Sequence, residues 1–220
     1  MFATRSMFEN PASRTHGAEE RWQPPGARPS ATHRSLGAQL RLQNLAISTS
    51  ISDHARALIE TRISEARRAG VVDLSLNVGD RASRWKLADA SGRIVGLIDL
   101  LDRGPVVMSF HLGEWFPYCA LAMRAMREWQ PEFEKFDAQT VFTSDNRVAR
   151  KFGVVMPFHD DVAKIYRDLG FDAPLAQTSF VPLPATFIID RRRVIRYAFV
   201  NPDYRRRAEP SQIARALTQL

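Results

Sequence analysis

The feature that most constrains this chain is a short apolar run that passes directly into an amphipathic helix. Residues 104–110, GPVVMSF, are almost entirely apolar and lie between Gly-Pro and Gly113, as expected of a strand buried on both faces of a sheet. Pro117 suits the first position of a helix, and apolar side chains then recur at helical spacing as far as Trp129. We therefore predict that the corner WFPYC, residues 115–119, joins a central strand to a helix.

The remaining pattern after this corner alternates strands with helices. It predicts strands at 139–144 (QTVFTS), 185–190 (ATFIID) and 194–200 (VIRYAFV), and helices at 145–153, 160–170 and 209–220. Before the corner, a turn at 89–92 indicates a hairpin. Strand, helix, strand, helix, hairpin and helix resembles the order of the thioredoxin core. The expected fold class is thus α/β, a thioredoxin-like three-layer sandwich with a mixed central sheet.

The N-terminal part of the chain has a different composition. Residues 1–38 are rich in proline, serine and arginine with little apolar periodicity, which predicts a disordered basic extension. Residues 40–72 carry apolar side chains at helical spacing, with Ser52 or Asp53 available as an N-cap, and are expected to form a leading helix. The predicted thioredoxin-like domain covers residues 74–220.

The cysteine count limits the redox chemistry. Cys119 is the single cysteine among 220 residues, so no disulfide can form within the chain. Any redox cycle must take its second thiol from another molecule. No cofactor is expected, and no zinc-ligand spacing suggests a metal.

Charge and hydropathy limit which partners and which cellular location are expected. The 31 lysines and arginines give a net charge of +7, with the densest runs at 191–193 and 205–207. We interpret both arginine runs as solvated turns, and without an aromatic-basic signature nucleic acid is not an expected partner. No apolar run approaches the roughly 18 residues of a membrane span, and the N-terminus has no signal-peptide core, so a cytoplasmic location is expected.

Several separate stretches resemble one known family. They are VGDRA (78–82), GPVVMSF with its Gly-aromatic corner, RVARKFGV (147–154), PATFIID (184–190) and AFVNPDYRRRAEP (198–210). Together they resemble the alkyl hydroperoxide reductase and thiol-specific antioxidant (AhpC/TSA) family, peroxiredoxin-like members of the thioredoxin superfamily. The resemblance covers about residues 78–220.

The resemblance implies a changed thiol motif. Family members with this C-terminal stretch typically carry W-C-P-Y-C at the corner, so Phe116 stands where the first cysteine is expected. In a thioredoxin register the lost cysteine is the nucleophile, and Cys119 is its resolving partner. In the peroxiredoxin register, Pro-x-x-x-Thr-x-x-Cys, Cys119 is the peroxidatic residue, although Leu112 and Phe116 replace the proline and threonine. Both registers remain open.

Two further departures concern the strand after the corner and the length of the chain. The family usually places an arginine shortly before Thr-Phe, where this chain has Pro184, the position of the cis-proline of thioredoxin-like reductases. The resemblance thus predicts a cis Leu183–Pro184 bond near the corner. The family also usually carries an additional strand and helix after about Gln139, which this chain lacks. Loss of a nucleophile and of a segment together suggest a divergent member.

The candidate site is centred on Cys119. Phe116 marks the lost cysteine, and the residues expected to line the site are Trp115, Pro117, Tyr118, Pro184 and Thr186. His111 is a candidate base, with a solvent-contacting histidine as the alternative, and Glu114 is more simply an exposed carboxylate. Asp203 and Tyr204 are interpreted as structural support for the last strand and helix.

Three functions are consistent with these residues. The first is a peroxiredoxin-like thiol oxidoreductase that uses Cys119 to reduce a hydroperoxide, with thioredoxin or a low-molecular-weight thiol as reductant and a homodimer as the expected assembly. The second is a redox-silent thioredoxin-fold module that binds a protein, in which Cys119 is a buried apolar residue. The third is a binder of nucleic acid or acidic surfaces through the arginine runs.

Overall fold

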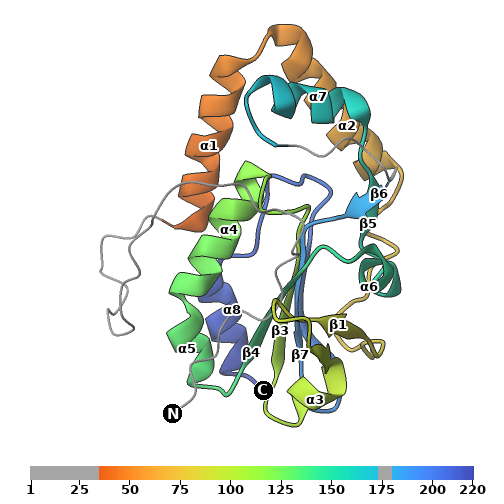
Figure 1. Cartoon of the computed structure of the whole chain (residues 1–220), viewed down its shortest axis with the longest axis vertical. Coiled ribbons are helices and arrows are strands. Elements are labelled where there is room, and N and C mark those ends of the chain that lie inside the picture. The colour runs from red at the N-terminus through yellow and green to blue at the C-terminus, as the bar shows by residue number, and fades with distance from the viewer. Residues whose placement is uncertain (1–34, 173–179) are drawn as a thin grey trace.

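The computed structural model describes residues 35–172 and 180–220, and shows helices on both faces of one central sheet (Figure 1). Most of the predicted extension, residues 1–34, lies outside the described part of the chain. The central sheet has the strand order β4-β3-β7-β8. Its strands are β3 (Val106–Phe110), β4 (Gln139–Thr143), β7 (Ala185–Ile189) and β8 (Ile195–Val200). Each of the four lies where the sequence predicts a strand.

The sheet is mixed because its two halves are connected differently. β3 and β4 are parallel, with Val106 opposite Gln139, and a helical crossover joins them. β7 is antiparallel to β3, with Ala185 opposite Phe110, and β8 is antiparallel to β7. β3 and β7 are therefore neighbours in the central sheet.

Alternate side chains of the sheet enter two separate cores, which makes three layers. Val107 and Ile188 pack with Met123 and Ile213 from the helices on one face. These helices are α4 (Pro117–Glu128), α5 (Gln130–Glu134) and α8 (Pro210–Leu217). On the other face, Phe187 packs against Phe152, with ring centroids 5.2 Å apart. That face carries α3 (Leu97–Leu101) and α6 (Asn146–Lys151).

Two short antiparallel pairs flank the sheet. β1 (Lys86–Ala88) and β2 (Ile94–Gly96) form the predicted hairpin, and β5 (Val155–Pro157) pairs with β6 (Phe180–Pro182). The carboxylate of Asp89 closes the hairpin turn, since its Oδ1 accepts from the backbone N–H groups of Ser91 at 2.9 Å and Arg93 at 3.0 Å. Helix α7 (Asp160–Asp168) lies in the chain between β5 and β6.

The leading helical segment is two helices rather than one. α1 (Leu36–Ser50) and α2 (Asp53–Arg68) are separated at residues 51–52. Ser52 caps α2, because its hydroxyl accepts from the N–H of Ala55 at 3.2 Å. α1 contacts α4, and α2 contacts α7 (Figure 1). Both helices therefore pack against the sheet domain.

A long-range cap fixes the beginning of α1. Glu209 occupies the N-cap position of α8 but makes no side-chain cap there. Its carboxylate instead accepts from the backbone N–H groups of Leu36 at 3.1 Å and Gly37 at 2.6 Å. A carboxylate at a helix N-terminus satisfies free N–H groups and complements the helix dipole. This contact ties the two ends of the described chain together. No helix of the described ranges is both long and apolar enough to cross a bilayer.

Candidate functional site

The corner between β3 and α4 is built by two residues with special backbone properties. Gly113 has a φ of 140°, and a Cβ at this position would lie 2.6 Å from the indole of Trp115, so the turn requires glycine. Pro117 occupies the first position of α4, with Phe116 as the N-cap residue. Cys119 follows in the first helical turn, where its N–H donates to the carbonyl of Phe116 at 2.8 Å. The helix therefore begins at the predicted residue.

The sulfur of Cys119 is buried against an arginine. The side chain is 0% exposed, and Nη2 of Arg207 donates to Sγ at 3.2 Å. The guanidinium of Arg207 is itself held by the backbone carbonyls of Arg206, at 2.8 Å, and Tyr204. A thiolate is the nucleophilic form of cysteine, and a neighbouring cation and a helix N-terminus both favour negative charge on sulfur. Cys119 is thus a fully buried cysteine whose sulfur contacts a guanidinium.

The interpretation of the arginine runs as solvated turns is correct for one run and wrong for the other. Residues 191–193 form the turn between β7 and β8, and two of the three are exposed. In the run 205–207, only Arg206 is exposed. The difference arises because the segment after β8 packs against three helices. Arg207 contacts the buried sulfur of Cys119 on α4, and Arg205 contacts Asn44 on α1 and Glu60 on α2.

Phe116, at the position of the expected cysteine, lies at the centre of an aromatic cluster. Its side chain is 0% exposed. Four aromatic rings have their centroids within 5.4 Å of the Phe116 ring centroid. They belong to Trp115 (5.2 Å), Tyr118 (5.4 Å), Tyr166 (4.9 Å) and Tyr204 (5.3 Å). Such tilted pairs add to the free energy gained from burial. The phenylalanine therefore fills its position with apolar packing.

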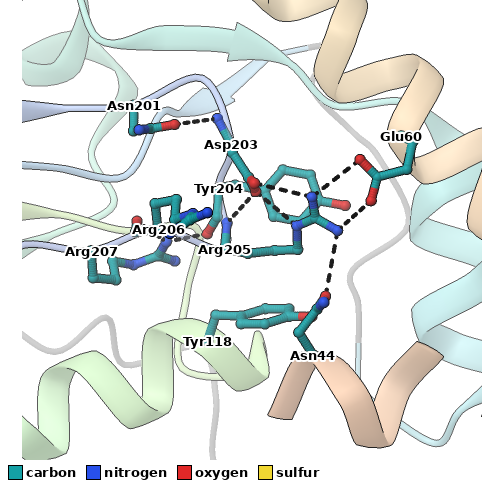
Figure 2. Close-up of polar contacts among 9 residues, drawn as sticks. All are labelled: Asn44, Glu60, Tyr118, Asn201, Asp203, Tyr204, Arg205, Arg206 and Arg207. Carbon is teal, nitrogen blue, oxygen red and sulfur yellow. Dashed lines mark hydrogen bonds and ion pairs between the residues drawn. The ribbon is translucent and has the colours of Figure 1, made fainter. Parts of the chain in front are cut away.

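The aromatic cluster connects to a polar network that includes the N-terminal helices (Figure 2). The hydroxyl of Tyr118 donates to Oδ1 of Asn44, on α1, at 3.1 Å. Arg205 donates to Asp203 from Nε at 2.8 Å and to Glu60, on α2, from Nη1 at 2.6 Å. Asp203 also accepts from the backbone N–H of Arg205 at 3.0 Å. Asp203 therefore holds Arg205, and Tyr204 packs against Phe116. Their support of the last strand and helix stays a prediction.

Burial sets the ionisation of the groups around the corner. Loss of solvation raises the pKa of Tyr118 to about 12, and it also raises the pKa values of Tyr166 and Tyr204. Burial, assisted by the charges of Arg207 and Arg127, lowers the pKa of His111 to about 4. The alternative interpretation of His111 as a solvent-contacting residue is wrong, since it is only 8% exposed. At neutral pH the tyrosines and this histidine are all uncharged.

The residues before β7 lie at the same end of the central strands as the corner. Ala185 pairs with Phe110, and Pro184 immediately precedes it, so Pro184 is next to the end of β3. Pro184 and Thr186 are both buried. The prediction of a cis Leu183–Pro184 bond is wrong, because no peptide bond of the described residues is cis. The trans form is the intrinsic preference of an X–Pro bond.

Glu114, the carboxylate beside the corner, forms an ion pair at the surface. Glu114 accepts from Nη2 of Arg127 at 3.2 Å, and both side chains are more than 40% exposed. This agrees with the expectation of an exposed loop carboxylate. Among the described residues, no group of three or more His, Cys, Asp or Glu side chains could hold a metal ion.

Sequence reasoning missed Arg207 and Asn44 as parts of this site. Arg207 lies within the C-terminal stretch that carried the family resemblance, but its contact with Cys119 joins residues 88 positions apart. Asn44 is on α1, in a segment expected to precede the domain, and reaches Tyr118 over 74 positions. No local pattern encodes such contacts. The nearest signal was the density of arginines at 205–207.

The fold and the corner together define a class of protein. A parallel β3-α4-β4 unit, an antiparallel β7-β8 pair and a thiol in the first turn of α4 are the features of a thioredoxin-like fold with a single-cysteine site. A family model described as "AhpC/TSA family" matches residues 78–198, which is more than half of the chain. The chain therefore belongs to the AhpC/TSA family and is a peroxiredoxin-like member of the thioredoxin superfamily.

Similar proteins carry peroxiredoxin names. "Peroxiredoxin Q, chloroplastic" of Oryza sativa subsp. japonica is 27% identical over 189 residues, which cover 83% of each chain. Among solved structures, peroxidoxin BcpB from Mycobacterium tuberculosis is 21% identical with a TM-score of 0.44, covering 66% of this chain and 98% of that one. The AhpC of Mycobacterium tuberculosis is 18% identical with a TM-score of 0.44, covering 66% and 92%.

Proposed function

We propose that this protein is a divergent, single-cysteine peroxiredoxin-like thiol oxidoreductase whose reacting atom is Sγ of Cys119. The observation that carries the proposal is the 3.2 Å contact from Nη2 of Arg207 to Sγ in the first turn of α4. A guanidinium and a helix N-terminus beside the same sulfur favour the nucleophilic thiolate. In this reading Cys119 acts in the peroxidatic register, and Phe116 marks the position of the lost cysteine.

The chemistry requires a hydroperoxide and an external thiol. The thiolate of Cys119 attacks the terminal oxygen of the hydroperoxide, the O–O bond breaks, and the alkoxide leaves and takes up a proton as an alcohol. The sulfenic acid that forms then condenses with an external thiol, releasing water and leaving a mixed disulfide. A second external thiol reduces this disulfide and restores Cys119. Thioredoxin or a low-molecular-weight thiol is the expected reductant, because the chain contains no second cysteine.

The remaining residues of the candidate site have positioning roles in this proposal. Pro117 starts the helix, and Trp115 and Tyr118 both pack against Phe116. Pro184 and Thr186 lie at the beginning of β7, next to the end of β3. Because Cys119 is fully buried under this layer, a peroxide reaches Sγ only when the corner opens. We therefore expect stoichiometric oxidation of Cys119 and little or no catalytic turnover.

Sulfenic acid trapping tests the proposal. The purified protein is treated with hydrogen peroxide and dimedone, and its intact mass is measured with time. We expect one dimedone adduct, which is absent in Cys119→Ser. The adduct should form more slowly in Arg207→Gln, because this variant lacks the guanidinium beside Sγ. The absence of an adduct in the folded wild type over hours would refute the proposal. It would favour the redox-silent binding module, for which the burial of Cys119 and Phe116 is the supporting observation.

A cytoplasmic location and a homodimer belong to the same proposal. The location stays a prediction, and the rice relative is named a chloroplastic protein. Light scattering coupled to size-exclusion chromatography measures the oligomeric state directly. A monomer at all concentrations would contradict the dimer without affecting the proposed chemistry.

A further inference from the structure

A cavity of about 560 Å³ lies between α1 and the segment that follows β8. Five arginines line it, together with two carboxylates, and it does not include Cys119. Its volume is within the range of roughly 300–1,000 Å³ that is usual for small-molecule sites. Arg207, which contacts Cys119, is one of the five arginines, so the cavity borders the candidate thiol site but lies outside it.

The two carboxylates of the cavity already have partners. Asp203 accepts from Nε and Nη2 of Arg205, at 2.8 and 3.0 Å, and this ion pair holds the pKa of Asp203 below its usual range despite burial. Glu209 accepts from two backbone N–H groups at the start of α1. Neither carboxylate therefore pairs with the other arginines of the cavity.

Four of the five arginines have no acidic partner in the described part of the chain, and one of these, Arg207, donates instead to Cys119 and to backbone carbonyls. The other three are exposed: Arg41 comes from α1, Arg67 from α2 and Arg206 from the segment after β8. Like charges brought together without counter-charges repel one another, and this repulsion is relieved when an anion binds between them. Guanidinium groups bind phosphate and carboxylate oxygens through paired hydrogen bonds.

The arrangement favours phosphate over carboxylate. The three guanidiniums approach from three different elements, and a tetrahedral phosphate presents oxygens in three dimensions, whereas a carboxylate presents two oxygens in one plane. Leu40 and Phe199 add apolar wall to the cavity. We propose that this cavity binds a phosphorylated small molecule, with the phosphate held by Arg41, Arg67 and Arg206 and the organic part lying against Leu40 and Phe199.

Pyrophosphate is the probe for the phosphate part of the site. Binding to the full-length protein is measured by titration calorimetry at constant ionic strength, with citrate as the carboxylate comparison. We expect saturable binding of pyrophosphate with a dissociation constant below about 1 mM, and binding of citrate at least about fivefold weaker. No saturation by pyrophosphate would overturn the proposal, and tighter binding of citrate would overturn the choice of phosphate.

Neighbouring arginines on α2 provide a matched pair of variants. Arg67 and Arg68 are both exposed, and Arg67 lines the cavity whereas Arg68 does not. Since each charge-assisted hydrogen bond contributes about 1.5–3 kcal/mol, Arg67→Gln and Arg206→Gln should each weaken pyrophosphate binding about tenfold or more. Arg68→Gln should change it less than about twofold. Equal losses in Arg67→Gln and Arg68→Gln would mean general attraction to a basic surface and would overturn the site.

A variant that adds a negative charge to the cavity tests the site in a protein that is expected to stay folded. Gln212 lines the cavity, is exposed, and its side chain has no hydrogen bond among the described residues. Gln212→Glu should leave the melting temperature of the free protein unchanged and weaken pyrophosphate binding, because it places a carboxylate within the cavity. Unchanged binding in this folded variant would overturn the proposed position of the anion.

Discussion

Phe116 lies at the centre of the corner that begins α4. The ring occupies the N-cap of α4, in contact with four other aromatic rings, and Cys119 follows one helical turn later. The proline and tyrosine between them match the motif that the family resemblance implies. The corner therefore has a helix start and a thiol, with an aromatic ring at the N-cap position.

Phe116→Cys should create an internal redox pair. We expect a disulfide between residues 116 and 119 under mild oxidation and a gain of thiol–disulfide turnover with a thioredoxin-type reductant. Loss of the buried ring should lower the free energy of unfolding of the reduced protein by about 2–4 kcal/mol. Thiol alkylation followed by intact mass measures the disulfide. Phe116→Ala, which loses the ring without gaining a thiol, is the control, and a folded Phe116→Cys that keeps two free thiols would contradict the prediction.

His111 should make the protein sensitive to acid. Its pKa is about 4 in the folded protein, below its ordinary value of 6.5, so between these pH values the unfolded state binds more protons than the folded state. Stability should therefore fall as the pH falls from 6.5 toward 4, by an amount on the order of 2–3 kcal/mol. Urea unfolding across this pH range measures the slope. His111→Leu should reduce it, whereas His54→Asn, at an exposed position on α2, should not.

At the scale of elements, the first two helices are held to the domain by groups that the sequence places far away. Glu209 caps α1, and Arg205 joins α1 and α2 to the segment after β8 through Asn44 and Glu60. These contacts bury Tyr118 beneath α1, with its hydroxyl on Asn44. The N-terminal helices thus form part of the wall of the candidate site.

Arg205 should contribute more to stability than its most exposed partner. Arg205→Lys keeps the charge but loses the planar fork that spans Asp203 and Glu60, and we expect the free energy of unfolding to fall by about 1–3 kcal/mol. Glu60 has a side chain that is 60% exposed, so Glu60→Gln should cost less than about 1 kcal/mol. Equilibrium urea denaturation compares the two variants. Equal effects would show that the fork geometry has no special role.

At the scale of the whole molecule, the position of α1 makes the N-terminal region part of the folded unit. Leu36, Leu40 and Ile47 of α1 are buried in the larger of the two apolar cores. The sequence predicted an extension over residues 1–38, and the part of it that the structure describes belongs to this helix.

Two truncations should separate the extension from the helix. Removing residues 1–51 deletes α1 and exposes the apolar surface of α4 that it covers, so the melting temperature should fall and the protein should self-associate. Removing residues 1–34 should leave the melting temperature unchanged, if the sequence prediction for the extension is correct. Differential scanning calorimetry and light scattering measure the two properties. A stable, monomeric protein without α1 would contradict the role assigned to this helix.

The sequence by itself determined the elements and the family. The alternation of apolar residues, Gly113, Pro117 and Ser52 act over a few positions, so the strands, the corner and a helix start could be predicted from local patterns. The break between α1 and α2 was missed because the apolar spacing runs across it, although Ser52 was recognised as a cap. Composition alone excluded an internal disulfide.

Only the tertiary structure decided what surrounds Cys119. The contacts of Arg207 with Cys119 and of Asn44 with Tyr118 join residues more than 70 positions apart, and the burial of His111 depends on elements from both halves of the chain. The burial of a side chain and the charge around it depend on all of its neighbours, and folding brings these neighbours together from distant parts of the sequence. The same arginine run that reads as a solvated turn in the sequence therefore becomes, in the fold, a contact to the thiol and one wall of an anion-binding cavity.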